Sequence, residues 1–112
     1  MTAETENIIN HMKEWISDKK GMDTEAIDVS GLTSLTDVFV ITSGSSDKNV
    51  QAIADHVEEE AENLGVSLLH KEGRQNGRWI LLDFNHIVVH VFHQEEREFY
   101  HLERLWSDGK RI

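Results

Sequence analysis

The sequence predicts a single α/β domain over residues 1–112, with three helices on a mixed sheet of about five strands. Apolar residues repeat at helical spacing near both ends of the chain and in its middle. Short β-branched and aromatic runs, which are typical of strands, separate these helical segments. The chain has no proline and no low-complexity tract, so no linker is expected within it.

The first helix is expected to begin near Thr5 and to end before Gly21. Thr5 is a candidate N-cap, because its hydroxyl can accept a hydrogen bond from a backbone N–H of the first turn. Gly21 is expected to end the helix in a left-handed conformation. The apolar stripe of this helix consists of Ile8, Ile9, Met12, Trp15 and Ile16.

Two strands are expected next, over residues 26–29 and 38–41, with a turn at Gly31 between them. The second run, Val38-Phe39-Val40-Ile41, is continuously β-branched or aromatic. A run of this kind is typical of a strand that is covered on both faces.

The second helix is expected to follow Gly44-Ser45-Ser46, with Ser46 as a candidate N-cap, and to end at Gly65. Acidic residues fill much of its expected solvent side. Its apolar stripe consists of Val50, Ile53, Ala54, Val57, Ala61 and Leu64. A third strand is then expected over residues 66–69, followed by a turn with two glycines over residues 73–77.

The last part of the chain predicts a hairpin and a third helix. Strands are expected over residues 78–84 and 87–93, joined around Asn85-His86, and a helix over residues 95–106. The strand-helix-strand crossover favours a parallel pair, whereas a hairpin is antiparallel, so the sheet is expected to be mixed. The apolar side of the last helix consists of Phe99, Leu102, Leu105 and Trp106.

Alternation along the hairpin predicts one face that combines aromatic and polar groups. Successive side chains of a strand point to opposite faces, so an even-numbered loop groups the aliphatic side chains of both strands together. The opposite face then carries Trp79, Asp83, His86 and His90. A large aromatic beside hydrogen-bonding groups is typical of a protein-binding surface. The alternative is a face covered by a helix, with Trp79 packed and the histidines bonded to backbone carbonyls.

The charge balance bears on the class of partner. Asp and Glu total 21 against 11 Lys and Arg, a net charge of −10 with neutral histidines. Binding to nucleic acid requires a basic patch, which the scattered basic residues do not form. An acidic surface suits a basic protein partner, although the charge could also serve only to keep the protein in solution. The acidic N-terminus, the absence of cysteine and the lack of any roughly 18-residue apolar run predict a cytoplasmic protein without a membrane span.

The sequence offers little for catalysis or metal binding. On a strand His93 points away from His86 and His90, which themselves lie on the order of 13 Å apart, too far to share one zinc ion. Gly44-Ser45-Ser46 resembles the Gly-Ser turn with which nucleotidyltransferases bind phosphate, but the chain has no Asp-x-Asp pair to hold Mg²⁺. We therefore expect no catalytic residue, metal site or cofactor. A nucleotidyltransferase-like enzyme or nucleotide sensor that uses this turn is the alternative function.

The order of several sequence pieces resembles the ribosomal silencing factors, also called Iojap-like proteins. Each piece alone is weak, but their order and spacing are specific, and they cover nearly the whole chain. The pieces are DVS at 28–30, LTDVFVITSGSS at 35–46, VQAIAD at 50–55, RWILLD at 78–83, VVHVF at 88–92 and REFYHLERLW at 97–106.

The resemblance implies a nucleotidyltransferase-like fold without a known catalytic role. It also implies a translational repressor that docks on the large ribosomal subunit through its basic fourteenth protein, uL fourteen, and sterically blocks association with the small subunit, with little direct contact to nucleic acid. Trp79 and His90 match family positions associated with that contact. The motif context adds Asp83, Phe84, Tyr100 and Glu103. A homodimer through the same hairpin face is a further alternative.

The sequence departs from the family pattern in two places. Many relatives read Asp-x-Gly-Asp at the hairpin turn, whereas this chain has Asp83-Phe84-Asn85-His86, which replaces an acid with a titratable base. After the serine turn many relatives carry Arg or His, whereas this chain has Asp47-Lys48-Asn49. The second change disfavours phosphate binding, because Asp47 places a negative charge at the start of a helix.

Overall fold

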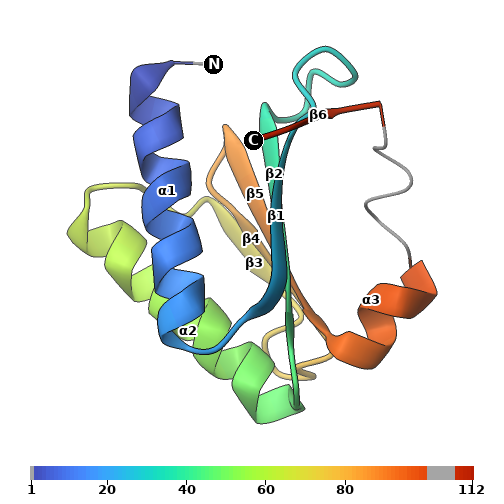
Figure 1. The fold of residues 1–112 in the computed structure, drawn as a ribbon. Coiled ribbons are helices and arrows are strands. Elements are labelled where there is room, and N and C mark those ends of the chain that lie inside the picture. Colours follow the sequence, from blue (N-terminus) through green and yellow to red (C-terminus); the bar gives the residue numbers. More distant parts are fainter. Residues whose placement is uncertain (1, 101–107) are drawn as a thin grey trace.

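The computed structural model describes residues 2–100 and 108–112 and shows a mixed six-stranded sheet with helices on both faces (Figure 1). The sheet order is β3-β4-β5-β2-β1-β6, and among these described strands only β2 and β5 pair in parallel. In chain order the elements are α1 (Ala3–Asp18), β1 (Met22–Asp28), β2 (Val38–Gly44), α2 (Asp47–Asn63), β3 (His70–Glu72), β4 (Trp79–Asp83), β5 (Ile87–His93), α3 (Gln94–Tyr100) and β6 (Lys110–Arg111).

The structure confirms the mixed α/β sheet, the three helices and the hairpin, with differences at the strands. The first strand begins earlier than expected, at Met22, and has an irregularity between Met22 and Glu25. The short strand β6, which pairs with Ile27 and Asp28 of β1, was not predicted, because two residues carry no readable alternation.

The expected third strand at residues 66–69 is wrong. Val66 donates its N–H to the carbonyl of Ala61 and so closes α2, and Val66 and Leu68 pack on the core as irregular chain. The strand comes later, at His70–Glu72, where every side chain is exposed. Apolar character alone does not distinguish a strand from irregular chain that is only partly buried, and Leu69 is 63% exposed.

The helix ends agree with the sequence for α2 and differ for α1. Ser46 caps α2 and Gly65 follows it with φ 86, both as predicted. The N-cap of α1 is Thr2 rather than Thr5, because Thr2 Oγ1 accepts the N–H of Thr5 at 3.1 Å. At the other end Lys20, with φ 62, takes the left-handed conformation expected of Gly21. Gly21 is required for a different reason, since a Cβ there would overlap Ile16.

The main core fills the space between α1, α2 and one face of the sheet (Figure 1). Its fully buried members include Ile9 and Met12 of α1, Ile53 of α2, and Val40 and Val89 of the central strands. Burial of each such side chain contributes roughly 1.5–3 kcal/mol to folding before the loss of conformational entropy is counted. None of the helices in the described ranges is long and apolar enough to cross a membrane.

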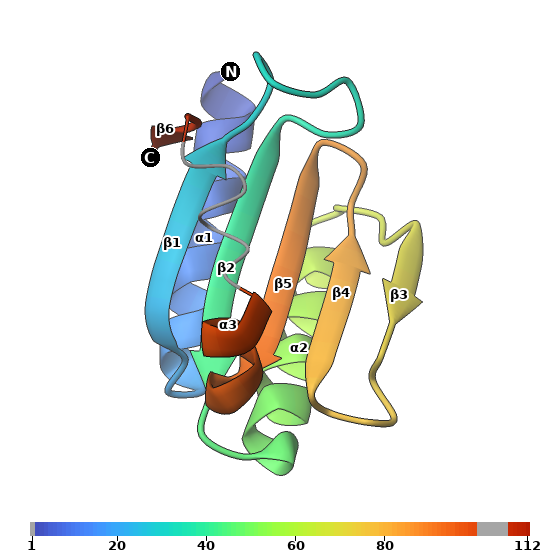
Figure 2. The same cartoon turned by 90° about the vertical axis from the view of Figure 1, so that its right-hand side faces the viewer.

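The opposite face of the sheet carries a smaller apolar cluster. Ile27, Val29, Ile41 and Phe92 are buried there, and Phe39 and Trp79 pack against them while staying partly exposed. Strand β2 is thus covered on both faces, as expected, except at Phe39. Helices α1 and α2 cover the first face of the sheet, and α3 lies over part of the second face (Figure 1 and Figure 2). Part of the second face therefore stays accessible.

Candidate functional site

The hairpin register brings Trp79, Asp83 and His90 to one face, as alternation predicted. In the antiparallel pair of β4 and β5, Trp79 lies opposite Phe92, Leu81 opposite His90, and Asp83 opposite Val88. Side chains that lie opposite each other share a face. We call this surface the Trp79 face; it consists of Trp79, Leu81, Asp83, Val88, His90 and Phe92, together with Phe39 of the neighbouring strand β2.

The Trp79 face lies on the side of the sheet away from α1 and α2. Figure 2 shows α3 in front of β2 and β5, and on this face no helix of the described residues lies in front of β4 or β3. Trp79, Leu81, Val88 and Phe39 are all partly exposed. The face therefore presents a strip of apolar side chains that are held by the sheet but accessible from one side.

One prediction about the histidines of this face is wrong, because His86 does not share it. His86 belongs to the turn, where its Nδ1 lies 3.2 Å from Asp37 Oδ2, and it lines a cavity near the N-terminus of α1. His90 does lie on the Trp79 face, as predicted, and it is buried there, with 5% of its surface exposed. Its ring packs edge-on against Phe39 and beside Phe92, and Phe39 comes from a strand far away in the sequence.

The buried His90 is bonded directly to the indole. Trp79 Nε1–H donates a hydrogen bond to His90 Nδ1 at 3.1 Å. Burial lowers the pKa of His90 to about 4, because the charged form would lose its hydration. The ring is therefore neutral near pH 7, with the lone pair on Nδ1 and the proton on Nε2.

Asp83 combines a structural role with partial exposure. Its Oδ1 accepts the backbone N–H of Asn85 at 2.8 Å, and Asn85 takes a left-handed conformation with φ 80. Asparagine tolerates that conformation better than most residues with a side chain. Asp83 thus stabilises the turn and leaves a carboxylate at the rim of the Trp79 face.

Of the other three predicted contact residues, the described structure places the side chain of Phe84 alone. Phe84 is 6% exposed and belongs to the main core on the opposite side. Tyr100 is the last residue of α3. Glu103 lies outside the described residues. The geometry therefore supports Trp79, Asp83 and His90 as one group.

Two arginines that the sequence reasoning missed hold α3 beside this face. Arg97 is buried and donates to Ser43 Oγ at 3.1 Å and to the carbonyl of Met22 at 3.4 Å. Arg78 precedes β4 and forms ion pairs with Glu95 and Glu96 at 3.1 and 3.0 Å. The available signal was weak: basic residues in an acidic chain, one directly before Trp79 and one in the last helix.

The histidines that suggested a metal are separated by their own partners. His86 contacts Asp37, His90 accepts from Trp79, and His93 Nδ1 accepts the N–H of Glu95 at 3.2 Å. Within residues 2–100 and 108–112 no group of three His, Cys, Asp or Glu side chains is placed to hold a metal ion.

The Gly44-Ser45-Ser46 turn is closed by its own neighbours. The N–H of Ser45 donates to Asn49 Oδ1 at 2.9 Å, and the N–H of Asn49 donates to Ser46 Oγ at 3.0 Å. Asn49 also donates to the carbonyl of Lys19 and so ties this turn to the end of α1. Two donors that a phosphate would need are therefore engaged, and Asp47 adds a negative charge.

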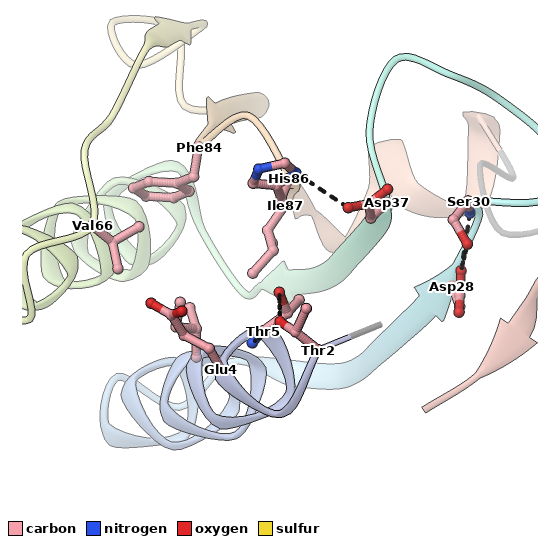
Figure 3. A pocket seen from close by; sticks show the side chains of 11 residues that line it. Thr2, Glu4, Thr5, Asp28, Ser30, Asp37, Val66, Phe84, His86 and Ile87 are labelled. Carbon is pink, nitrogen blue, oxygen red and sulfur yellow. Dashed lines mark hydrogen bonds and ion pairs between the residues drawn. The ribbon is translucent and has the colours of Figure 1, made fainter.

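A cavity of about 550 Å³ lies between the N-terminus of α1 and the hairpin turn (Figure 3). Its apolar lining consists of Ile8, Val66, Phe84 and Ile87. Its charged side chains are the carboxylates of Glu4, Asp28 and Asp37, with His86 beside Asp37. The acidic rim disfavours an anionic ligand here.

Comparison with known proteins places the chain in a family. Residues 2–112 match the family described as "Ribosomal silencing factor during starvation". The ribosomal silencing factor RsfS of Bacillus subtilis is 44% identical over 92 residues, which are 82% of this chain and 78% of that protein. A crystal structure from Chromobacterium violaceum has a TM-score of 0.89 at 34% identity and covers 91% of this chain and 85% of its own. One from Bacillus halodurans has a TM-score of 0.85 at 34% identity, with 96% and 97% covered. The chain belongs to the family of ribosomal silencing factors.

Proposed function

We propose that this protein represses translation by binding the large ribosomal subunit through the basic protein uL fourteen and by sterically blocking the small subunit. The names of its relatives support a role in silencing the ribosome. The large subunit and uL fourteen rest on the family resemblance of the motifs around Trp79 and His90. The protein acts by binding, without a cofactor and without catalysis.

The Trp79 face is the observation that carries this proposal. A half-buried indole beside Leu81 and Val88 offers apolar area whose orientation is already fixed by the sheet. Residues that dominate binding energy in protein interfaces are enriched in tryptophan and lie among packed apolar neighbours. Asp83 at the rim adds a carboxylate for a basic partner.

The net charge supports a protein partner rather than RNA. At −10, the chain is repelled by phosphate, whereas a basic ribosomal protein attracts it and raises the rate of encounter. Since the attraction is long-ranged, it is screened by salt within roughly 10 Å at 0.1 M ionic strength. Association should therefore slow with added salt while the contact itself stays apolar.

Co-sedimentation with separated ribosomal subunits tests the proposal. The protein is expected to travel with the large subunit alone, and large subunits incubated with it are expected to form fewer complete ribosomes when small subunits are added. A joining reaction followed by light scattering measures the second effect. Retention on the small subunit, or joining at the rate seen without the protein, would refute the proposed mechanism.

A further inference from the structure

Two of the contacts that the structure describes for the Trp79 indole act on it in different ways. The indole stacks on Phe92, with ring centroids 4.8 Å apart and planes 27° from parallel. Stacking sets the plane of the ring but does not decide between the two orientations that a half-turn about the Cβ–Cγ bond exchanges. The hydrogen bond from Nε1 to His90 Nδ1, at 3.1 Å, selects one of these orientations and so decides which edge of the indole faces outward.

A histidine at position 90 supplies this acceptor at a cost in folding free energy. Because Nδ1 accepts from Trp79, the proton of the neutral ring sits on Nε2. Nε2 is buried and has no hydrogen-bond partner among the residues that the structure describes. An unpaired buried donor costs roughly 1–3 kcal/mol, a cost that a phenylalanine ring would avoid. Packing alone therefore does not account for His90, whereas an acceptor aimed at the indole does.

We propose that His90 is a positioning residue: it holds the Trp79 indole in the rotamer in which the Trp79 face meets its partner. This inference rests on the proposed function for the partner, but the geometry of the indole can be tested without one. His90 acts through Trp79, because it is itself too buried to be touched. A pre-oriented indole binds better than a mobile one, since less rotamer freedom is lost on contact.

Two substitutions separate the acceptor from the bulk of the ring. His90→Phe keeps an aromatic ring and removes the acceptor, whereas His90→Asn keeps an acceptor oxygen near the position of Nδ1 and removes the ring. The first readout is the indole ¹H–¹⁵N resonance of Trp79, assigned by its loss in Trp79→Phe. We expect this resonance to shift and its proton to exchange faster in His90→Phe, and to stay near the wild-type position in His90→Asn.

The second readout is the affinity for the large subunit. We expect His90→Phe to lose roughly tenfold in affinity and His90→Asn to stay within about threefold of wild type. Leu64→Ala is the control, because Leu64 lies at the end of α2 on the other side of the sheet, and its affinity should be unchanged. If circular dichroism shows that His90→Phe does not fold, His90→Leu replaces it, because leucine also lacks an acceptor.

The two readouts keep the inference and the proposed function apart. An unchanged Trp79 resonance in His90→Phe, or wild-type affinity of that variant, would overturn the positioning role. If the wild-type protein itself does not bind large subunits, the proposed function fails, and the indole resonance alone then decides whether His90 orients Trp79.

Discussion

Arg97 of α3 and Ser43 of β2 are joined by a buried hydrogen bond of 3.1 Å between the guanidinium and the hydroxyl. The two residues are 54 positions apart in the chain. The same guanidinium reaches the carbonyl of Met22 and lies 3.9 Å from Glu25. This contact fixes the short helix α3 on the sheet beside the Trp79 face.

Removal of this contact should destabilise the protein. Arg97→Met is expected to lower the free energy of unfolding by about 2 kcal/mol, because the Ser43 hydroxyl and the Met22 carbonyl lose a buried donor. Urea unfolding measures the loss. Arg111→Met is the matched control, since Arg111 is exposed and lies 3.7 Å from the same Glu25; it should cost less than about 0.5 kcal/mol. Equal losses of stability in both variants would contradict a stabilising role for the buried contact of Arg97 with Ser43.

The neutral state of His90 predicts a pH dependence of stability. The folded-state pKa is about 4, against 6.5 for an unburied histidine, so the unfolded chain takes up this proton first as the pH falls. Stability is unaffected by this titration well above pH 6.5 and falls progressively below it, and the loss reaches roughly 3 kcal/mol at pH 4.

Comparison of wild type with His90→Phe isolates this term, since the carboxylates titrate in both proteins. Urea unfolding from pH 7.5 to pH 4 should show wild type losing more stability than the variant. The ring contacts described around His90 are with Phe39, Trp79 and Phe92, none of which carries a charge. Parallel pH curves for the two proteins would show that His90 is not a buried neutral base.

Two glycines with similar backbone conformation should respond differently to alanine. Gly73 has φ 81, and a Cβ there would overlap the carbonyl of Trp79, whereas Gly65 has φ 86 and open space around it. Gly65→Ala should cost about 1 kcal/mol from backbone strain alone. Gly73→Ala should cost at least about 2 kcal/mol and shift the Trp79 amide resonance, because the start of β4 must move. Thermal unfolding and NMR together check both parts, and similar losses without a shift would be inconsistent with the contact.

The closed serine turn predicts that nucleotides do not bind. The backbone N–H groups of Ser45 and Asn49 already donate hydrogen bonds to neighbouring side chains. Titration of the protein with ATP and Mg²⁺ should therefore give no saturable heat. Heat that saturates near one equivalent would revive the nucleotidyltransferase-like alternative.

Local patterns in the sequence were sufficient to predict which side chains share a face. Alternation on a strand has a period of two and does not depend on the rest of the fold, so the placement of Trp79 and His90 on one face followed from the hairpin alone. Serine and glycine at the ends of α2 behaved as caps for equally local reasons.

What the sequence could not predict depends on distant contacts. The burial of His90 requires Phe39, which reaches it through the parallel pairing of β2 with β5. Likewise, the buried state of Arg97 depends on Ser43 and Met22, and the pairing of β6 depends on β1. Hydrophobic periodicity carries no information about such distant partners. A charged or titratable residue at these positions is therefore predicted to be exposed.

The affinity of the large ribosomal subunit for wild type, Trp79→Ala and Leu64→Ala is the most direct measurement of the central claim. Trp79 lies on the accessible sheet face, whereas Leu64 is 44% exposed at the end of α2 in the opposite layer. Trp79→Ala should remain folded and lose at least roughly tenfold in affinity, with Leu64→Ala unchanged. Wild-type affinity in a folded Trp79→Ala protein would contradict the assignment of the Trp79 face as the docking surface.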